Sequence, residues 1–85
     1  MPTNDKITGY TKHGEEQVLG RDGGVGVSND ALIDTVNDPI EIVVQGSDYG
    51  PTYKYISEKA VVVLNEIGEV ITAYARGSMW TRGGK

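Results

Sequence analysis

The 85-residue sequence contains no cysteine and no phenylalanine, and it has a single histidine and a single tryptophan. Without cysteine there are no disulfides and no thiolate metal ligands, and one histidine argues against a structural zinc site. No apolar run approaches the ~18 residues that a membrane span requires, and the amino-terminal segment lacks the apolar core of a signal peptide. We therefore expect no metal, no cofactor and no membrane insertion.

Positive charge is also scarce. Eight Lys and Arg residues stand against twelve Asp and Glu residues, which gives a formal net charge of −4. This balance argues against a protein that coats nucleic acid through bulk electrostatics. It leaves open an enzyme that acts on RNA, because a local cluster of cations matters more there than the total. The length allows one small domain, and twelve glycines indicate many turns.

Two helices are predicted in the first half of the chain. The first begins after Thr11, whose hydroxyl is a good amino-terminal cap, and ends at Gly20. The second begins after Ser28, another good cap, and carries an apolar stripe at helical spacing. Pro39 disfavours helical geometry in the residue before it and so ends this helix.

After the second helix the apolar period becomes alternating, which predicts strands. They are expected over residues 40–45, 52–57, 59–65 and 69–76. The third is apolar on both faces, as in a central strand, and Gly68 suits the hairpin turn before the fourth. In the fourth strand we place Ile71, Ala73 and Ala75 on one face.

The expected fold class is α+β, with two N-terminal helices packed on an antiparallel sheet of about four strands. The helices should cover one face of the sheet and leave the other face polar. Residues 1–10 show no clear period and are predicted to be a leader. Residues 11–82 form the single domain, and residues 83–85 form a tail.

The last predicted strand carries the first group of candidate site residues. Alternation places Thr72, Tyr74 and Arg76 together on one face. A hydroxyl, a phenol and a guanidinium in a row suit a phosphate, because Arg offers a bidentate fork and Tyr a flat ring. The alternative is an ordinary solvated sheet face, where all three residue types are common.

His13 and Trp80 are the other candidates. Histidine is the side chain whose ordinary pKa lies nearest neutrality. Glu16 and Gln17 are three and four residues further on, so both could hydrogen-bond the ring across one helical turn. A surface histidine is the alternative. Trp80 lies close to Arg76 and Arg82 in sequence and could stack a nucleic-acid base. It could equally anchor the end of the chain on the core.

Two long stretches resemble a known family. They are "KHGEEQVLGRDGGVGVSNDALIDTVNDPIEI" and "TYKYISEKAVVVLNEIGEVITAYARGSMW". They are similar to the C-terminal toxin domains of bacterial polymorphic and contact-dependent inhibition proteins, and more narrowly to those with the barnase/EndoU/colicin/RelE (BECR) ribonuclease fold. The shared pattern is a histidine that opens the first helix (His13), an arginine (Arg21) before "GVS", and the "AVVVLN" hairpin. It covers residues 12–80.

The resemblance implies a metal-independent endoribonuclease that cleaves RNA, in particular tRNA. The ribose 2′-hydroxyl would attack the adjacent phosphorus and leave a 2′,3′-cyclic phosphate and a 5′-hydroxyl. We assign acid–base work to His13, with Glu16 orienting it, and charge stabilisation to Arg76. Thr72 and Tyr74 would hold phosphate oxygens. The residues assigned to substrate binding are Arg21, Lys54 and Trp80.

The resemblance also implies a biological setting. Such a toxin is secreted or delivered from the surface of the producer, acts in the cytoplasm of a target bacterium, and is neutralised by a cognate immunity protein. Outside that complex we expect a monomer. The rival interpretation is a non-enzymatic interaction module, such as an acidic immunity or adaptor protein. The two differ in whether His13 and the row from Thr72 to Arg76 converge.

Overall fold

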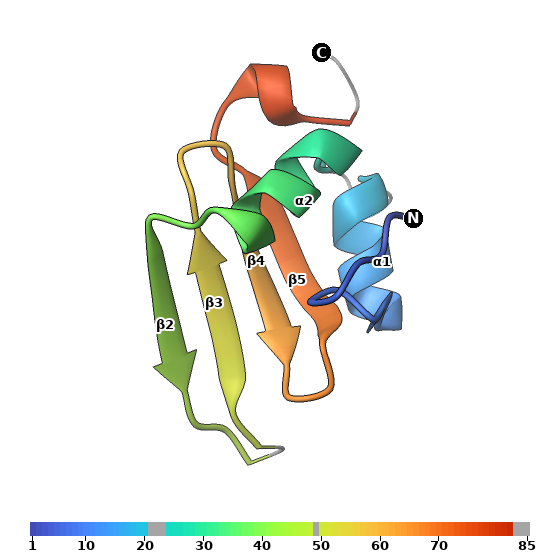
Figure 1. Ribbon diagram of the computed structural model, residues 1–85. Coiled ribbons are helices and arrows are strands. Elements are labelled where there is room, and N and C mark those ends of the chain that lie inside the picture. The colour runs from blue at the N-terminus through green and yellow to red at the C-terminus, as the bar shows by residue number, and fades with distance from the viewer. Residues whose placement is uncertain (21–23, 49, 83–85) are drawn as a thin grey trace.

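The computed structural model describes residues 1–20, 24–48 and 50–82 (Figure 1). In chain order the elements are β1 (Gly9–Tyr10), α1 (Lys12–Leu19), α2 (Asn29–Asn37), β2 (Glu41–Gln45), β3 (Thr52–Ile56), β4 (Ala60–Asn65), β5 (Glu69–Ala75) and a 3-10 turn, η1 (Ser78–Trp80). The strands form one sheet in the order β1-β5-β4-β3-β2. The apolar strand β4 is therefore central, as its sequence predicts.

This arrangement corrects the expected fold class. The sheet has five strands instead of about four, and it is mixed, because β1 pairs with β5 in parallel while the other pairs are antiparallel. The helices are not both N-terminal to the sheet, since β1 comes before α1 and lies in the segment predicted to be a leader. A two-residue strand is too short to show a period in the sequence, so β1 was missed.

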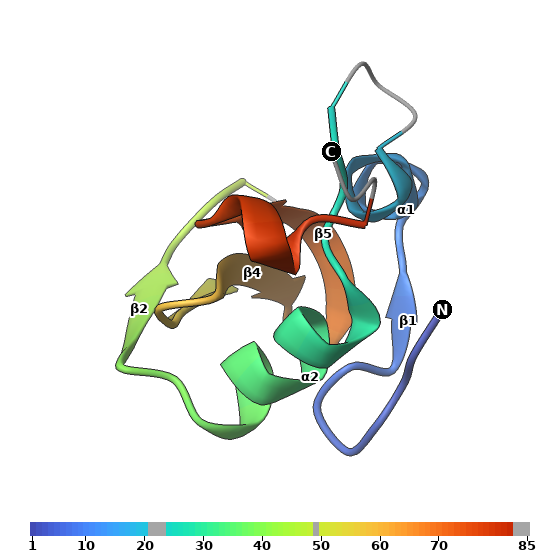
Figure 2. The ribbon, with the colours of Figure 1, turned by 90° about the horizontal axis from the view of Figure 1, so that it is seen from above.

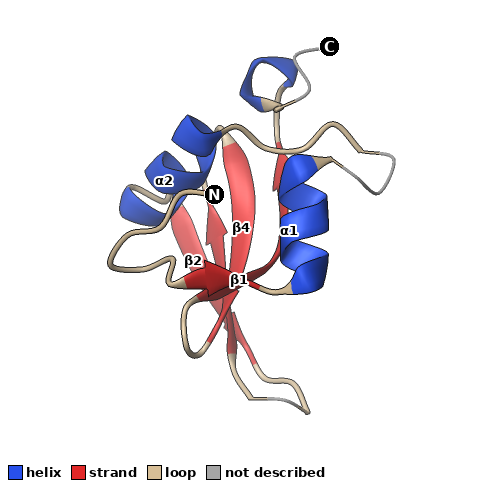
Figure 3. Cartoon of the chain, turned by 90° about the vertical axis from the view of Figure 1, so that its right-hand side faces the viewer, coloured by secondary structure: helices blue, strands red, loops and turns tan. Residues whose placement is uncertain are grey.

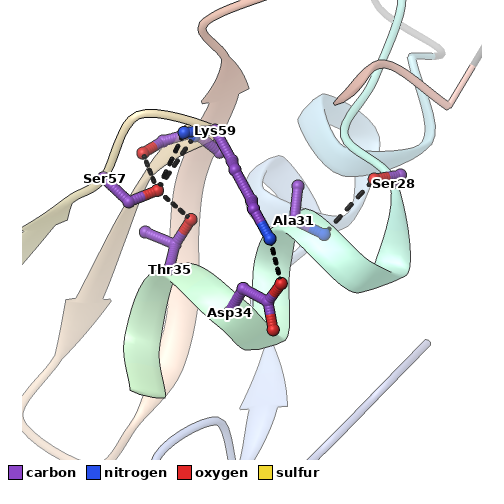
Figure 4. Close-up of polar contacts among 7 residues, drawn as sticks. Ser28, Ala31, Asp34, Thr35, Ser57 and Lys59 are labelled. Atoms are coloured by element: carbon purple, nitrogen blue, oxygen red, sulfur yellow. Dashed lines mark hydrogen bonds and ion pairs between the residues drawn. The ribbon is translucent and has the colours of Figure 1, made fainter. Parts of the chain in front are cut away.

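The helix ends follow the predicted local signals. Thr11 Oγ1 accepts a hydrogen bond from the Gly14 amide at 3.0 Å, and Gly20 closes α1 in the left-handed conformation with φ 76°. Ser28 Oγ accepts from the Ala31 amide at 3.3 Å and caps α2 (Figure 4). These caps satisfy backbone groups that a helix terminus leaves open.

The core lies between α2 and one face of the sheet, here called the helix face. Figure 2 shows α2 on one side of β4 and β5, with α1 apart from it beyond β5. The buried apolar residues of the core are Ile7, Val18, Val27, Ala31, Leu32, Val36, Ala60, Val62, Leu64, Val70 and Ala73. On the opposite side of the sheet, here called the open face, no helix of the described residues lies over the middle strands.

The turn between β3 and β4 is tied to α2 by polar contacts (Figure 4). The hydroxyls of Thr35 and Ser57, both buried, are 2.8 Å apart. Lys59 forms an ion pair with Asp34 at the more exposed rim. The buried hydroxyl pair satisfies groups that would otherwise cost free energy inside the core.

α1 stands at the edge of β5 instead of over a sheet face. Seen from the β1 edge in Figure 3, α2 and α1 lie on either side of β4. Gly14 permits this position, because a Cβ there would lie 1.8 Å from the Val70 carbonyl oxygen. The Thr11 amide donates to the same oxygen at 3.0 Å. The helix and the strand backbone therefore touch without an intervening side chain.

β5 contains an irregularity at this contact. Thr72 pairs with Val63, but Val70 pairs with the next residue of β4, so Ile71 is an extra residue without a partner there. The expected apolar row of Ile71, Ala73 and Ala75 is thus wrong in its first member. Val70 is the fully buried residue, and Ile71 is half-buried. A bulge of this kind adds one residue to a strand and shifts the alternation beyond it.

Candidate active site at the border of α1 and β5

The predicted polar row of β5 lies on the open face. Thr72 is opposite Val63 of β4, and Tyr74 is opposite Val61. Thr72 is half-buried and Tyr74 is 51% exposed. Lys54 of β3 is also opposite Val63, so Lys54 and Thr72 flank this valine at a Cα separation of about 10 Å, two strand spacings. The structure thus places Lys54, a predicted substrate-binding residue, on the same face of the sheet as Thr72 and Tyr74.

α1 packs along β5. A pocket of about 200 Å³ lies between the two elements, lined by Gln17, by residues 24–26 and by residues 73–75 of β5. Of the β5 residues, Ala73 and Ala75 belong to the helix face and Tyr74 to the open face. Gln17 is four residues after His13, so the two share one face of α1. His13 is exposed and lies one turn away from the pocket. The helix that carries the histidine packs beside the strand that carries Thr72 and Tyr74. The start of this helix is next to Val70, so His13 lies toward the opposite end of β5 from Arg76.

Glu16 and Arg76 do not make the contacts that their predicted roles suggest. Among the described residues, no hydrogen bond joins His13 to Glu16. Arg76 continues the row beyond β5, where its amide donates to the Lys59 carbonyl at 2.9 Å. Its guanidinium Nη1 donates to the Ser57 carbonyl at 2.8 Å. Arg76 thus lies at the β3–β4 turn end of the open face.

Trp80 lies against the core. Its ring is partly buried beside the apolar cluster, and the Lys59 ammonium sits 4.8 Å from the ring centroid. The Trp80 carbonyl accepts from the Ser28 amide at 2.8 Å, which ties η1 to the start of α2. This placement favours the anchoring alternative. Arg21, the remaining predicted residue, lies outside the described residues.

The four-residue spacing of Gln17 from His13 predicted that the two side chains share one face of the helix, and the structure adds that Gln17 lines the pocket beside β5. Arg82 was not among the predicted site residues. Arg82 donates from Nε to the Val18 carbonyl at 3.3 Å and also bonds the Asn29 side chain, so it holds the chain end against α1 and α2. Its charge also reaches Tyr10: burial raises the pKa of that phenol to about 12, and Arg82 partly opposes the rise.

Neither a metal site nor a membrane-spanning helix appears in the part of the chain that the structure describes. Residues 1–20, 24–48 and 50–82 contain no group of three or more His, Cys, Asp or Glu side chains that could hold a metal ion. Within the same ranges, no helix is long and apolar enough to cross a bilayer. The groups available for chemistry are the imidazole of His13 on α1 and, on the open face, the hydroxyl of Thr72, the phenol of Tyr74 and the cations of Lys54 and Arg76.

The chain is similar to a segment of the tRNA nuclease WapA of Bacillus subtilis (strain 168). The two sequences are 48% identical over 80 residues. The two segments are homologous. The match covers 94% of this chain and 3% of the other protein, so the chain spans a small fraction of the length of the curated relative that it matches. No protein-family model and no solved structure matches the chain.

Proposed function

We propose that this chain is a nuclease domain that cleaves tRNA. The observation that carries the proposal is the 48% identity, over 94% of the chain, to a segment of a protein named as a tRNA nuclease. The packing of α1 along β5 is compatible with it, because the helix that carries the single histidine is next to the strand that carries Thr72 and Tyr74. Such a set suits phosphodiester cleavage, which needs an acid–base group and donors for the developing charge.

In the proposed mechanism the ribose 2′-hydroxyl attacks the adjacent phosphorus. His13 takes the hydroxyl proton, the bond from phosphorus to the 5′-oxygen breaks, and that oxygen receives the proton from the protonated His13. The products are a 2′,3′-cyclic phosphate and a 5′-hydroxyl, and no metal takes part. The exposure of His13 supports this role, since the ring can reach a substrate laid across the border. Glu16 is proposed to orient the ring once RNA is bound.

The phosphate is proposed to lie over the row of the open face. Thr72 and Tyr74 would donate to its oxygens, and Arg76 would stabilise the charge of the phosphorane. Lys54 lies in the same row as Thr72 and would hold a neighbouring phosphate. Arg21 and Trp80 remain proposed substrate contacts. The guanidinium of Arg76 has five donors and uses one on Ser57 here, which leaves others for phosphate.

The domain is further proposed to act as a toxin. It would be part of a longer protein that reaches the surface of a producing bacterium, enter the cytoplasm of a target cell, and be neutralised by a cognate immunity protein. The match to a small part of a much longer protein supports the idea of a module within a larger chain.

The test is to incubate the purified protein with total bacterial RNA and to sequence the fragments. We expect cuts in tRNA, with ribosomal RNA largely intact. Expression in bacteria without an immunity protein should also arrest growth. Intact RNA together with normal growth would refute the nuclease function and leave the rival interpretation, a non-enzymatic interaction module. Cuts in ribosomal RNA alone would refute the proposed substrate while retaining the enzyme.

A further inference from the structure

β2 forms the free edge of the sheet. It is the last strand in the order, with β3 on one side and no strand among the described residues on the other (Figure 1). Every second residue of such an edge strand directs its backbone N–H and C=O groups outward. Apolar side chains accompany this open edge: Ile40 is 67% exposed, Ile42 is 47% exposed and Val44 is 61% exposed.

This edge lacks the features that usually keep a sheet edge from pairing. Proteins protect such strands with Lys or Pro residues, bulges or very short lengths. β2 pairs with β3 in an unbroken register over five rows, from Glu41 to Gln45. Its sequence, EIVVQ, contains no proline and no lysine, and Glu41 is its only charged residue. The strand is therefore a template for a further antiparallel strand.

We propose that β2 pairs with β2 of a second copy of this chain, antiparallel, about a two-fold axis at Val43. In this register Val43 meets its own copy, Ile42 meets Val44 of the second copy, and Glu41 meets Gln45 of the second copy. A two-fold interface presents the same patch from both sides, so the strand must be complementary to itself. The five residues of β2 satisfy that condition.

The apolar rows of the pair continue an existing surface. Ile42 is opposite Tyr55 and Val44 is opposite Tyr53, all on the helix face. Both tyrosines are half-buried and line a pocket of about 260 Å³. Pairing would bury Ile42 and Val44 of both copies between two pairs of tyrosines. The gain comes from removing these side chains from water and from closing the open backbone edge.

The charges of the chain are compatible with this register, and they predict how the stability of the dimer depends on salt. Within the five rows no like charges meet, because Glu41 lies opposite a neutral amide. Each copy carries a formal net charge of −4, so two copies repel each other at long range. Salt screens such repulsion between exposed charges. The dimer should therefore strengthen as the ionic strength rises, whereas pairing with a basic partner would weaken.

The proposed dimer does not depend on the proposed function. The border of α1 and β5 lies toward the opposite edge of the sheet from β2. A ten-stranded sheet built through two β2 strands would carry one candidate active site toward each outer end. Pairing therefore leaves both sites accessible, and the test below requires no nuclease activity.

Disulfide trapping tests the register, because the chain has no native cysteine. Val43→Cys places two thiols on the axis at a Cα separation of about 4.5–5.5 Å, inside the range that a disulfide spans. Mild oxidation should convert most of this variant to a covalent dimer. Val63→Cys is the matched control, since Val63 is also half-buried on the open face but belongs to the central strand β4. It should remain largely monomeric.

The second measurement is the mass in solution by light scattering. Wild type should approach twice its 9.1 kDa at high protein concentration, and more readily in high salt than in low salt. Val44→Lys should remain at the monomer mass, whereas Ile67→Lys, at an equally exposed turn position, should still dimerise. A wild-type chain that stays monomeric at every salt concentration, or equal trapping of the Val43 and Val63 variants, would overturn the proposal.

Discussion

Arg76 serves the fold and, in our proposal, the chemistry. Arg76→Ala removes one hydrogen bond to the Ser57 carbonyl, which should cost only about 1 kcal/mol of stability at this exposed position. Loss of charge stabilisation in the transition state should raise the barrier to tRNA cleavage by about 2–4 kcal/mol. Arg76→Lys should restore part of the rate, because a point charge lacks the planar fork. Cleavage at the wild-type rate by a folded Arg76→Ala variant would remove Arg76 from the site.

Substitution of Trp80 tests whether its ring anchors the end of the chain on the core or stacks on a base. Its ring packs on the core, so Trp80→Ala should lower the free energy of unfolding by about 3 kcal/mol, the lower end for loss of a large buried aromatic side chain. Met79→Ala, one residue earlier and 75% exposed, is the control and should change stability little. Thermal melts of both variants decide the anchoring role. A Trp80 variant with wild-type stability and weakened RNA binding would instead support stacking.

The raised pKa of Tyr10 leads us to expect that the free energy of unfolding falls at alkaline pH. Burial raises its pKa from 10.0 to about 12, so folding favours the neutral phenol. That contribution is fully present below pH 10 and is lost as the pH rises from 10 toward 12. Unfolding measured across this range should show a shallower alkaline decline for Tyr10→Phe than for wild type. Tyr74→Phe, at an exposed ring, should follow wild type, and identical declines in all three proteins would contradict the assignment.

Among the structural elements, the contact of α1 with β5 depends most on one glycine. Gly14→Ala would place a methyl group 1.8 Å from the Val70 carbonyl oxygen. Alanine favours a helix by up to about 1 kcal/mol over glycine, but forcing α1 off the strand should cost more. We expect a net loss of about 2 kcal/mol in the free energy of unfolding. Gly46→Ala, where the added methyl group meets nothing within 4 Å, is the control for denaturant melts. A Gly14→Ala variant as stable as wild type would show that the contact is not close.

Local sequence signals made the helices and the long strands predictable. The short strand β1 and the bulge in β5 depend on tertiary packing and were not predictable. Thr11, Gly20 and Ser28 define helix ends through hydrogen bonds and dihedral angles within a few residues, so sequence alone suffices. β1 depends on a partner far along the chain, in β5, and has no pattern of its own. The burial of Val70 in place of Ile71 likewise follows from the bulge, which the alternation rule cannot anticipate.

The candidate site was predictable to a similar extent. Alternation along one strand placed Thr72 and Tyr74 together, and the register of three strands then added Lys54 to their row. The position of His13 beside β5 could not be deduced, because it follows from the close approach of Gly14 to Val70. The packing of Trp80 is also a tertiary property, since its neighbours come from α2 and the β3–β4 turn.

At the scale of the whole molecule, the two edges of the sheet have different roles in our account. The side of the sheet that holds β5 and α1 carries the proposed chemistry, and the β2 edge carries the proposed pairing. The net charge of −4 leaves few cations for RNA. Lys54 and Arg76 are the two described cations on the open face, whereas Lys6 and Lys59 contact α2. Affinity for tRNA should therefore come from a small footprint around the reacting phosphate and one neighbouring phosphate.

The most direct measurement is the chemistry of the tRNA ends after cleavage in EDTA. Wild-type protein should leave 2′,3′-cyclic phosphate and 5′-hydroxyl ends, because in our proposal His13 activates the ribose hydroxyl without a metal. His13→Ala should leave tRNA intact while keeping its fold, and Lys12→Ala, the neighbouring exposed position, should still cleave. Ends with a 5′-phosphate, a requirement for a divalent metal, or undiminished cleavage by the His13 variant would contradict the account.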